Sequence, residues 1–235
     1  MQKLIKKIPT SVWIVAGVVA AIFVVFGVYQ MNENKVAAQR FSTEKDTSLI
    51  VRSVTQRDHT IGDVGAPIQL IVYSDFSCPY CRHLFGENIP KLQAEYPGKI
   101  VVAFRHFPFA SQPGTKVEAE ASECVYQLGG ESAFWKFANY MFERNGVKGD
   151  ASALTNAAVH SGVEADAYKE CMIQDRGVER VEQDRVEASI AGVSMTPTEV
   201  LKSAHRALVV RGNYYSQLRE GIRYLLNADA QIESR

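Results

Sequence analysis

The sequence predicts an α/β fold, because strand and helix patterns follow one another along the chain beyond residue 57. An apolar, β-branched run at residues 67–73 is typical of a buried strand, and apolar residues at helical spacing follow it directly. A second strand pattern at 99–104 precedes a long stretch of helical periodicity. Two more strand patterns and an amphipathic helix then close the chain.

Composition narrows the classes of function. The chain has 235 residues, 46% of them hydrophobic, which suffices for one substantial domain or for a domain with an insertion. Lysine plus arginine and aspartate plus glutamate both total 26, so no basic excess indicates nucleic-acid binding. The sequence contains no Gly-rich phosphate loop and no repeat, and we expect neither a cofactor nor a metal ion.

The N-terminus predicts a membrane anchor. Residues 8–32 carry no charge and 12–28 are almost wholly apolar, long enough as a helix to cross a hydrocarbon core of about 30 Å. A cleaved signal peptide is the alternative, but its apolar region usually has only about 7–15 residues. Lys3, Lys6 and Lys7 favour a cytoplasmic N-terminus with the rest exported to an oxidising compartment.

We therefore expect a stub and single transmembrane helix over residues 1–30, acting as a signal-anchor, and a tether over 31–57. The tether is polar and mixed in charge. It is expected to be partly helical and to end in a short edge strand at Leu49-Ile50-Val51.

Residues 85–96 are expected to belong to the helix that follows the first strand. Pro90 should bend it, because proline lacks a backbone donor, and Pro97-Gly98 should end it. In the helical stretch, Gly129-Gly130 should stop one helix and Asp150 should cap another.

The last helix of that stretch is expected to bury a face made of Val178, Val181, Val186 and Ile190. Strands are then expected at 198–202 and 207–211, and an amphipathic helix from Tyr215 to Leu225.

Cys78 and Cys81 lie where the first strand ends and its helix begins. With Cys78 at the N-cap, Pro79 falls at the first helical position, where its missing N–H costs nothing. Cys81 lies one turn further on, within reach for a disulfide. The free N–H groups and the helix dipole favour a thiolate at Cys78, which predicts a redox-active pair. Half a zinc site or a structural bridge are the alternatives, but zinc would need a second ligand pair.

The run Asp75-Phe76-Ser77-Cys78-Pro79-Tyr80-Cys81 resembles the active site of DsbA-like thiol–disulfide oxidoreductases of the thioredoxin superfamily. The resemblance covers roughly residues 58 to 226 and is specific in combination. Further matching segments are Asp58-His59, Gly65-Ala66-Pro67, Arg105-His106-Phe107-Pro108, Phe134-Trp135, Gly192-Val193 and Thr196-Pro197-Thr198.

The resemblance implies a thioredoxin-like fold with an inserted helical subdomain. Residues 58–106 would form the first part of the thioredoxin-like fold, 107–192 the helical insertion and 193–235 the second part. It also implies that Pro197 is cis and faces the cysteine pair, with Thr196 close to the sulfurs. The sequence alone favours a trans proline, since only about 5–6% of X–Pro bonds are cis.

Two residues near the cysteines have a supporting role or none. Tyr80, between them, should tune the pKa and the contacts of the pair. His83 in its charged form could favour the thiolate, although a histidine there is more often an exposed helix residue. His106 is interpreted as structural.

One departure from the resembled family concerns a buried acid. Such sequences commonly carry an acid six residues before the first cysteine, where this chain has Val72, whereas Glu199 occupies a position that is usually apolar. We hypothesise that the acid has moved to the neighbouring strand, where Glu199 could accept a proton from Cys81. The alternative is that Glu199 points to solvent through a shift in register.

Cys124 and Cys171 both fall on apolar helical faces. In an exported protein they could form a structural disulfide inside the helical subdomain. The alternative is a pair of buried, inert thiols.

Together these features predict a membrane-anchored oxidoreductase with its catalytic domain on the periplasmic, or extracytoplasmic, side of a bacterial cytoplasmic membrane. The resemblance favours oxidation of exported proteins by the Cys78/Cys81 pair, with reoxidation by a quinone-linked membrane partner. A reductase or isomerase is the first alternative. A non-catalytic assembly or chaperone subunit that uses the peptide groove is the second, although such a binder needs no pair of thiols.

Overall fold

The computed structural model describes residues 10–42, 51–109, 111–112, 114–211 and 214–234. The chain divides into two compact units, Met1–Thr43 and Glu44–Arg235. The first contains α1 (Thr10–Ser42), which extends well into the predicted tether. Among the residues placed in the structure, no helix combines the length and the apolar character that a membrane span needs, so the predicted anchor is not confirmed.

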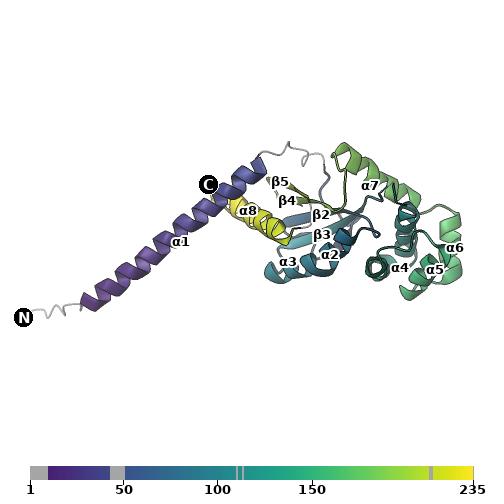
Figure 1. Ribbon diagram of the computed structural model, residues 1–235, viewed down its shortest axis with the longest axis horizontal. Helices are drawn as coiled ribbons and strands as arrows, with labels where there is room; N and C mark the ends of the chain where they lie inside the picture. The colour runs from purple at the N-terminus through teal and green to yellow at the C-terminus, as the bar shows by residue number, and fades with distance from the viewer. Residues whose placement is uncertain (1–9, 43–50, 110, 113, 212–213, 235) are drawn as a thin grey trace, which may run out of the picture. The chain divides into compact units, whose positions relative to one another are not determined.

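The second unit is built on a five-stranded sheet with the order β1-β3-β2-β4-β5 (Figure 1). Strands β2 and β3 are parallel and every other pair is antiparallel. The strands are β1 (His59–Ile61), β2 (Ile68–Ser74), β3 (Ile100–His106), β4 (Thr198–Lys202) and β5 (Ala207–Arg211).

Successive side chains of each strand point to opposite faces of the sheet. One face holds Ile71, Tyr73 and Val200 in a buried cluster that also contains Ala188 and Ala191, at the end of α7 (Val178–Ile190). The register places Val72 opposite Phe104 and Glu199, so these three share the other face. The Phe104 ring contacts Phe76 and Phe85, which shows that this second face lies under the cysteine turn and the helix after it.

The helix after β2 has three parts, namely α2 (Pro79–His83), π-helix η2 (Leu84–Asn88) and α3 (Ile89–Glu95). Pro90 lies in the first turn of α3, directly after the π-helix η2. We predicted a bend at this proline, and the structure has a π-turn just before it, a feature that often accompanies bends in helices.

Four helices lie between β3 and β4: α4 (Thr115–Arg144), α5 (Ala151–His160), α6 (Ala165–Ile173) and α7. Figure 1 shows α4, α5 and α6 gathered to one side of the sheet. Gly130 breaks the regular geometry of α4 with φ 72° and ψ −169°, close to the predicted stop. Asp150 caps α5 as predicted, because its side chain accepts a hydrogen bond from Ala153 N at 2.7 Å.

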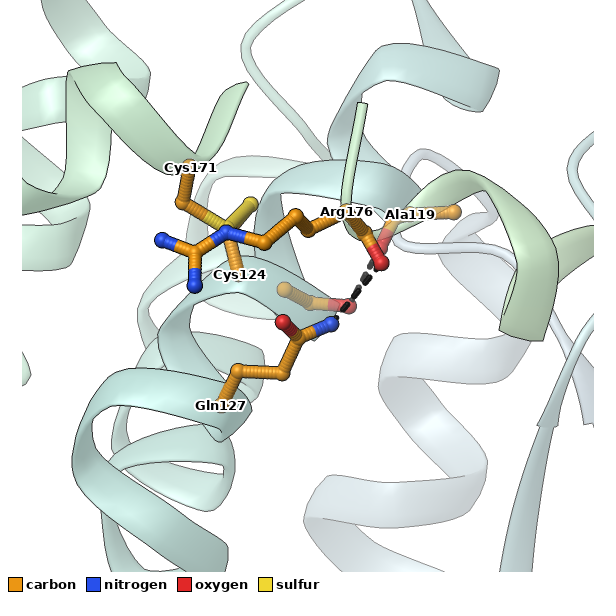
Figure 2. Close-up of a disulfide and its surroundings, with 6 residues drawn as sticks. Ala119, Cys124, Gln127, Cys171 and Arg176 are labelled. Carbon is orange, nitrogen blue, oxygen red and sulfur yellow. Dashed lines mark hydrogen bonds between the residues drawn. A yellow bond between two sulfur atoms is a disulfide. The ribbon is translucent and has the colours of Figure 1, made fainter. Parts of the chain in front are cut away.

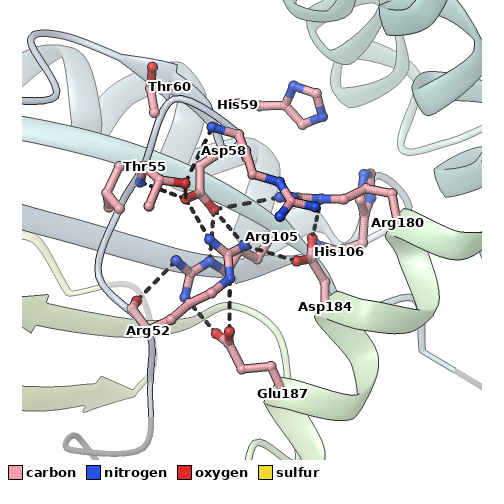
Figure 3. A network of polar contacts seen from close by, with 12 residues as sticks. Arg52, Thr55, Asp58, His59, Thr60, Arg105, His106, Arg180, Asp184 and Glu187 are labelled. Carbon is pink, nitrogen blue, oxygen red and sulfur yellow. Dashed lines mark hydrogen bonds and ion pairs between the residues drawn. The ribbon is translucent and has the colours of Figure 1, made fainter.

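The buried face of α7 differs from the prediction. Val186 and Ile190 are 56% and 61% exposed, whereas Val181, Asp184 and Ala188 are buried. The cause is polar contacts: Asp184 pairs with Arg52, which precedes β1, and Glu187 pairs with Arg105 on β3 (Figure 3).

Most of the predicted edge strand at Leu49-Ile50-Val51 lies outside the described residues, and Val51 itself is buried but not in a strand. One edge of the sheet is β1, paired antiparallel with β3. The C-terminal helix α8 (Tyr215–Glu233) contacts β2, β4 and β5 and extends beyond its expected end.

Figure 3 shows the polar network that joins α7 to the sheet. Arg105 is fully buried and donates to Asp58 at 3.0 Å, and Arg52 donates to the same carboxylate at 2.7 Å. Arg105 also reaches Glu187 on α7. Although burial acts to raise it, the hydrogen bonds from Arg52 and Arg105 hold the pKa of Asp58 well below its usual range. Removing one partner from such a buried network typically costs about 3–5 kcal/mol.

A disulfide joins α4 to α6 (Figure 2). Cys124 and Cys171 are bonded with a Cα–Cα distance of 5.8 Å, which confirms the expected structural bridge. Beside it, Gln127 Nε2 donates to the carbonyl oxygen of Arg176 at 2.8 Å. The bridge therefore lies inside the helical insertion and apart from the other two cysteines.

We predict that a Cys124→Ala/Cys171→Ala variant has a free energy of unfolding about 3–4 kcal/mol lower than the parent, because the bridge closes a long loop in the unfolded chain. Urea titration of both proteins would measure the difference. A Cys78→Ser/Cys81→Ser variant is the matched control and should change far less. Equal midpoints for the parent and the bridge-free variant would contradict the prediction.

Candidate active site

Cys78 is the N-cap residue of α2, with extended backbone angles of φ −85° and ψ 117°, and Pro79 occupies the first turn as predicted. The carbonyl oxygen of Cys78 accepts a hydrogen bond from Arg82 N at 3.1 Å, which begins the helix. Its sulfur therefore lies beside the N–H groups that the first helical turn leaves without intrahelical partners.

The surroundings of the Cys78 sulfur stabilise its thiolate form. A hydrogen bond with the Cys81 thiol contributes most, and it lowers the pKa of Cys78 to about 6 although burial acts against it. A hydrogen bond with the Thr196 side chain and the N–H groups of Cys81 and Tyr80 act in the same direction. Only 7% of Cys78 is exposed.

Cys81 has the opposite character. It is fully buried, and burial raises its pKa well above the ordinary value, with the Cys78 sulfur adding to the rise. At neutral pH the site thus combines a thiolate that keeps a small exposed area with a protonated thiol that is fully buried. That asymmetry divides the pair into a sulfur that reacts with an outside partner and a sulfur that reacts only with its neighbour.

The peptide bond between Thr196 and Pro197 is cis, as the resemblance implied. The Thr196 carbonyl oxygen lies 3.4 Å from the Cys78 sulfur. The loop before β4 therefore lies against the cysteine turn, although 118 positions separate the two residues in the chain.

Glu199 is fully buried on β4 and is paired in register with Val72 on β2. The alternative that it points to solvent is therefore wrong. Because Glu199, Val72 and Phe104 share the face beneath the active-site helix, the acid lies on the same side of the sheet as the cysteine turn. The structure thus has a buried acid on the strand next to Val72, directly opposite the position where the resembled family carries its acid.

Tyr80 and His83 lie on the outer side of α2. Tyr80 is 66% exposed. His83 Nδ1 lies 3.1 Å from Glu87 Oε1, in a contact between side chains that are both about half exposed. Such a contact is typical of a solvated helix surface, so His83 faces Glu87 rather than the sulfurs.

Sequence reasoning missed two acids next to the cysteine turn. Asp75 accepts hydrogen bonds from Ser77 N at 2.8 Å and from Phe109 N at 2.7 Å. Glu118, on α4, accepts a hydrogen bond from Ser77 Oγ at 2.9 Å. Asp75 was visible within the motif, but Glu118 has no local signal because 41 positions separate it from Ser77.

A second polar cluster lies between α4 and the strands β1 and β3. His59, His106 and Glu123 are buried, and their ligand atoms lie within 4.8 Å of one another, close enough for a metal ion. Both Nε2 atoms, however, lie within hydrogen-bond distance of the same Glu123 oxygen, at 2.9 and 2.8 Å.

The other ring nitrogen of His59 lies 3.2 Å from Glu131. Burial acts to lower the pKa of His59, but hydrogen bonds with the carboxylates of Glu123 and Glu131 raise it above its ordinary value. We interpret this cluster as a hydrogen-bonded network that fastens α4 to the sheet.

A Cys-x-x-Cys pair at the start of a helix, opposite a cis-proline loop on a sheet of this order, defines a thioredoxin-like domain. The sequence model of a family described as Thioredoxin matches residues 54–206, well over half of the chain. The chain belongs to the thioredoxin family.

Solved structures share this fold over most of the chain. BdbD from Bacillus subtilis, in its oxidised form, superposes with a TM-score of 0.66 at 21% identity, covering 75% of this chain and 96% of that one. Alpha-DsbA1 from Wolbachia pipientis has a TM-score of 0.66 at 20% identity, covering 80% and 100%. DsbA from Chlamydia trachomatis has a TM-score of 0.65 at 19% identity, covering 77% and 96%. Likeness at this level of identity establishes the fold.

Curated relatives match through a small part of their length. The Na(+)/H(+) antiporter NhaA 1 of Salinispora arenicola is 30% identical over 151 residues, which is 64% of this chain and 22% of the antiporter. The antiporter NhaA of Herminiimonas arsenicoxydans is 28% identical over 183 residues, or 77% and 28%. The chain thus spans less than a third of the length of either relative, and their name describes proteins several times longer.

We predict that alkylation of the reduced domain modifies Cys78 with a rate that reaches half its maximum near pH 6, while Cys81 stays unmodified. The reason is that only the thiolate reacts and only Cys78 is an accessible anion. Mass spectrometry after a brief pulse of iodoacetamide at a series of pH values would measure this.

A Cys81→Ala variant provides the comparison. It removes the hydrogen bond that contributes most to the low pKa of Cys78, so its half-maximal rate should move to higher pH. A parent midpoint near the ordinary thiol value of about 8.5 would contradict the prediction.

Proposed function

We propose that this chain is a thiol–disulfide oxidoreductase that introduces disulfides into exported proteins through Cys78 and Cys81. The observation that carries the proposal is the contrast between the two thiols, one held as an anion at the helix N-terminus and the other buried and protonated. The shared fold with DsbA structures supports the same class of reaction.

The reaction starts from the Cys78–Cys81 disulfide. A substrate thiolate attacks the Cys78 sulfur, the bond between the two cysteines breaks, and Cys81 leaves and takes up a proton. A second substrate thiolate then attacks the substrate sulfur of the mixed disulfide, and Cys78 leaves as a thiolate. The substrate loses two electrons to the cysteine pair, and a low pKa makes Cys78 a good leaving group.

The direction of electron transfer depends on whether the oxidised or the reduced form of the cysteine pair is the more stable. A stabilised Cys78 thiolate favours the reduced pair, and that makes the oxidised pair a stronger oxidant. The pKa near 6 lies between the values of about 3.5 for DsbA and about 7 for thioredoxin. Each turnover leaves the pair reduced, so an oxidase needs an electron acceptor, for which we propose a quinone-linked membrane partner.

An oxidising compartment is supported by the other two cysteines. The Cys124–Cys171 bridge is a structural disulfide, and such bridges form and persist mainly outside the cytosol. We therefore place the catalytic domain on the extracytoplasmic side of a bacterial envelope, where cysteine-containing exported proteins are its substrates.

We predict that the purified protein, equilibrated with glutathione, shows a Cys78/Cys81 potential above that of thioredoxin, about −270 mV, and below that of DsbA, about −120 mV, because the pKa of Cys78 also lies between the values of those two proteins. It should also speed the oxidation of a reduced, unfolded test protein. A Cys124→Ala/Cys171→Ala variant that stays folded should keep this activity, and Cys78→Ser should lose it. A potential at or below that of thioredoxin would favour a reductase.

We further propose that Glu199 accepts the proton of Cys81 when that thiol acts as nucleophile. Cys81 is protonated at neutral pH and has no route to solvent, so a buried acid on the same face of the sheet is a suitable acceptor. Glu199 and Val72 face each other across β4 and β2, so an acid at either position would lie in the same row beneath the cysteine turn.

We predict that Glu199→Gln slows the attack of Cys81 on a Cys78 mixed disulfide about tenfold or more and flattens its pH dependence, because proton transfer of this kind is worth about 10²–10⁴-fold. Stopped-flow release of a chromophoric thiol would measure the rate. The double variant Val72→Glu/Glu199→Val should recover part of the rate by restoring the acid on the other strand. An unchanged pH profile in Glu199→Gln would defeat the relay.

A further inference from the structure

Two buried carboxylates hold the residue that precedes the nucleophile. Asp75 is 4% exposed and binds the backbone N–H of Ser77 at 2.8 Å, and Glu118 is fully buried and binds the Ser77 hydroxyl at 2.9 Å. Ser77 is thus fixed through both its main chain and its side chain. Because Cys78 follows it directly, the two acids help to set where the reactive sulfur lies.

The same two acids tie other segments to the cysteine turn. The second oxygen of Asp75 accepts a hydrogen bond from Phe109 N at 2.7 Å, and that of Glu118 accepts from Val147 N at 2.6 Å. The loop after α4 lies so close that a Cβ at Gly146 would come within 2.1 Å of Ser77 Oγ. This crowding leaves little room for Ser77 to move without breaking both bonds.

The two acids are held by hydrogen-bond donors of the cysteine turn and of neighbouring loops. Across the residues that the structure describes, neither Asp75 nor Glu118 forms an ion pair with a lysine, arginine or histidine. The groups that face the Asp75 carboxylate are the N–H groups of Ser77 and Phe109, the acid Glu118 and the Cys78 sulfur. A thiolate at Cys78 therefore forms beside a like charge.

We propose that Asp75 is a positioning residue whose buried negative charge, backed by Glu118, restrains the thiolate at Cys78 and so limits how strongly oxidising the pair is. The inference deepens the proposed function and rests on Cys78 being its nucleophile. Burial first, and then Glu118 and Cys78, raise the pKa of Asp75 to about 6 against the pull of the two N–H groups. The two residues belong to one tight turn, in which the Asp75 carbonyl oxygen accepts a hydrogen bond from Cys78 N at 3.1 Å. Asp75 and Cys78 ionise in the same range of pH, and because like charges in one turn repel, ionisation of either should make ionisation of the other harder.

The first test is Asp75→Asn, which removes the charge and keeps the size of the side chain, although its single oxygen can accept only one of the two N–H bonds. The titration of Cys78, followed by thiolate absorbance in the reduced protein, should move to lower pH by about one unit, since a like charge nearby disfavours a thiolate. The equilibrium with glutathione should move about tenfold toward the reduced pair. Asp166→Asn is the matched control, because that side chain is 87% exposed and pairs with Lys169 on α6, and it should change neither measurement.

The second test runs the coupling in reverse and does not depend on how Asp75→Asn folds. The titration of Asp75, followed by carbon NMR of labelled aspartate in the reduced protein, should move to lower pH in Cys78→Ser by a similar amount, because coupling between two sites is reciprocal. Coincident Asp75 curves in the parent and Cys78→Ser would overturn the inference. So would a Cys78 titration in folded Asp75→Asn that stays in place or moves to higher pH. Both readouts are independent of oxidase activity, so the inference and the proposed function can fail separately.

Discussion

The active site depends on the placement of one sulfur at the point where β2 ends and α2 begins. The parallel strand pair places that turn at one end of the sheet, and the helix that starts there presents unpaired N–H groups to Cys78. The Cys81 thiol, one turn further on, adds the strongest single stabilisation of the Cys78 anion. The burial that favours a neutral Cys81 thus also makes it an effective hydrogen-bond donor.

The rest of the fold keeps this turn in place from several sides. From one side, the loop before β4 brings the Thr196 carbonyl oxygen to the sulfur. The helical insertion approaches through α4, whose Glu118 binds Ser77. That insertion is fastened by the Cys124–Cys171 bridge and by the network around Arg105, in which a buried guanidinium joins α7 to the sheet. The insertion therefore contributes to the site's chemistry as well as covering it.

Much of the local structure could be predicted from the sequence. The strands at 198–202 and 207–211, the cap at Asp150 and the position of Pro79 in the first turn of α2 were all found, because each depends on residues close in the chain. The buried face of α7 was predicted wrongly, since periodicity favoured Val186 and Ile190 over Asp184. A polar side chain such as Asp184, which faces inward to pair with Arg52 and Arg180, breaks the rule on which such a prediction relies.

The sequence by itself determined the reactive motif, because a strand, a turn and a helix start within a few residues place Cys78 at a cap and Cys81 one turn along. The resemblance to a known family also indicated Glu199 as an unusual acid, because that position is usually apolar there and the acid is expected in place of Val72. Only the tertiary structure decided what surrounds the sulfur. Thr196 and Glu118 reach the cysteine turn from elements far apart in the chain. Electrostatic forces on a thiol depend on distance in space, and sequence spacing does not report that distance.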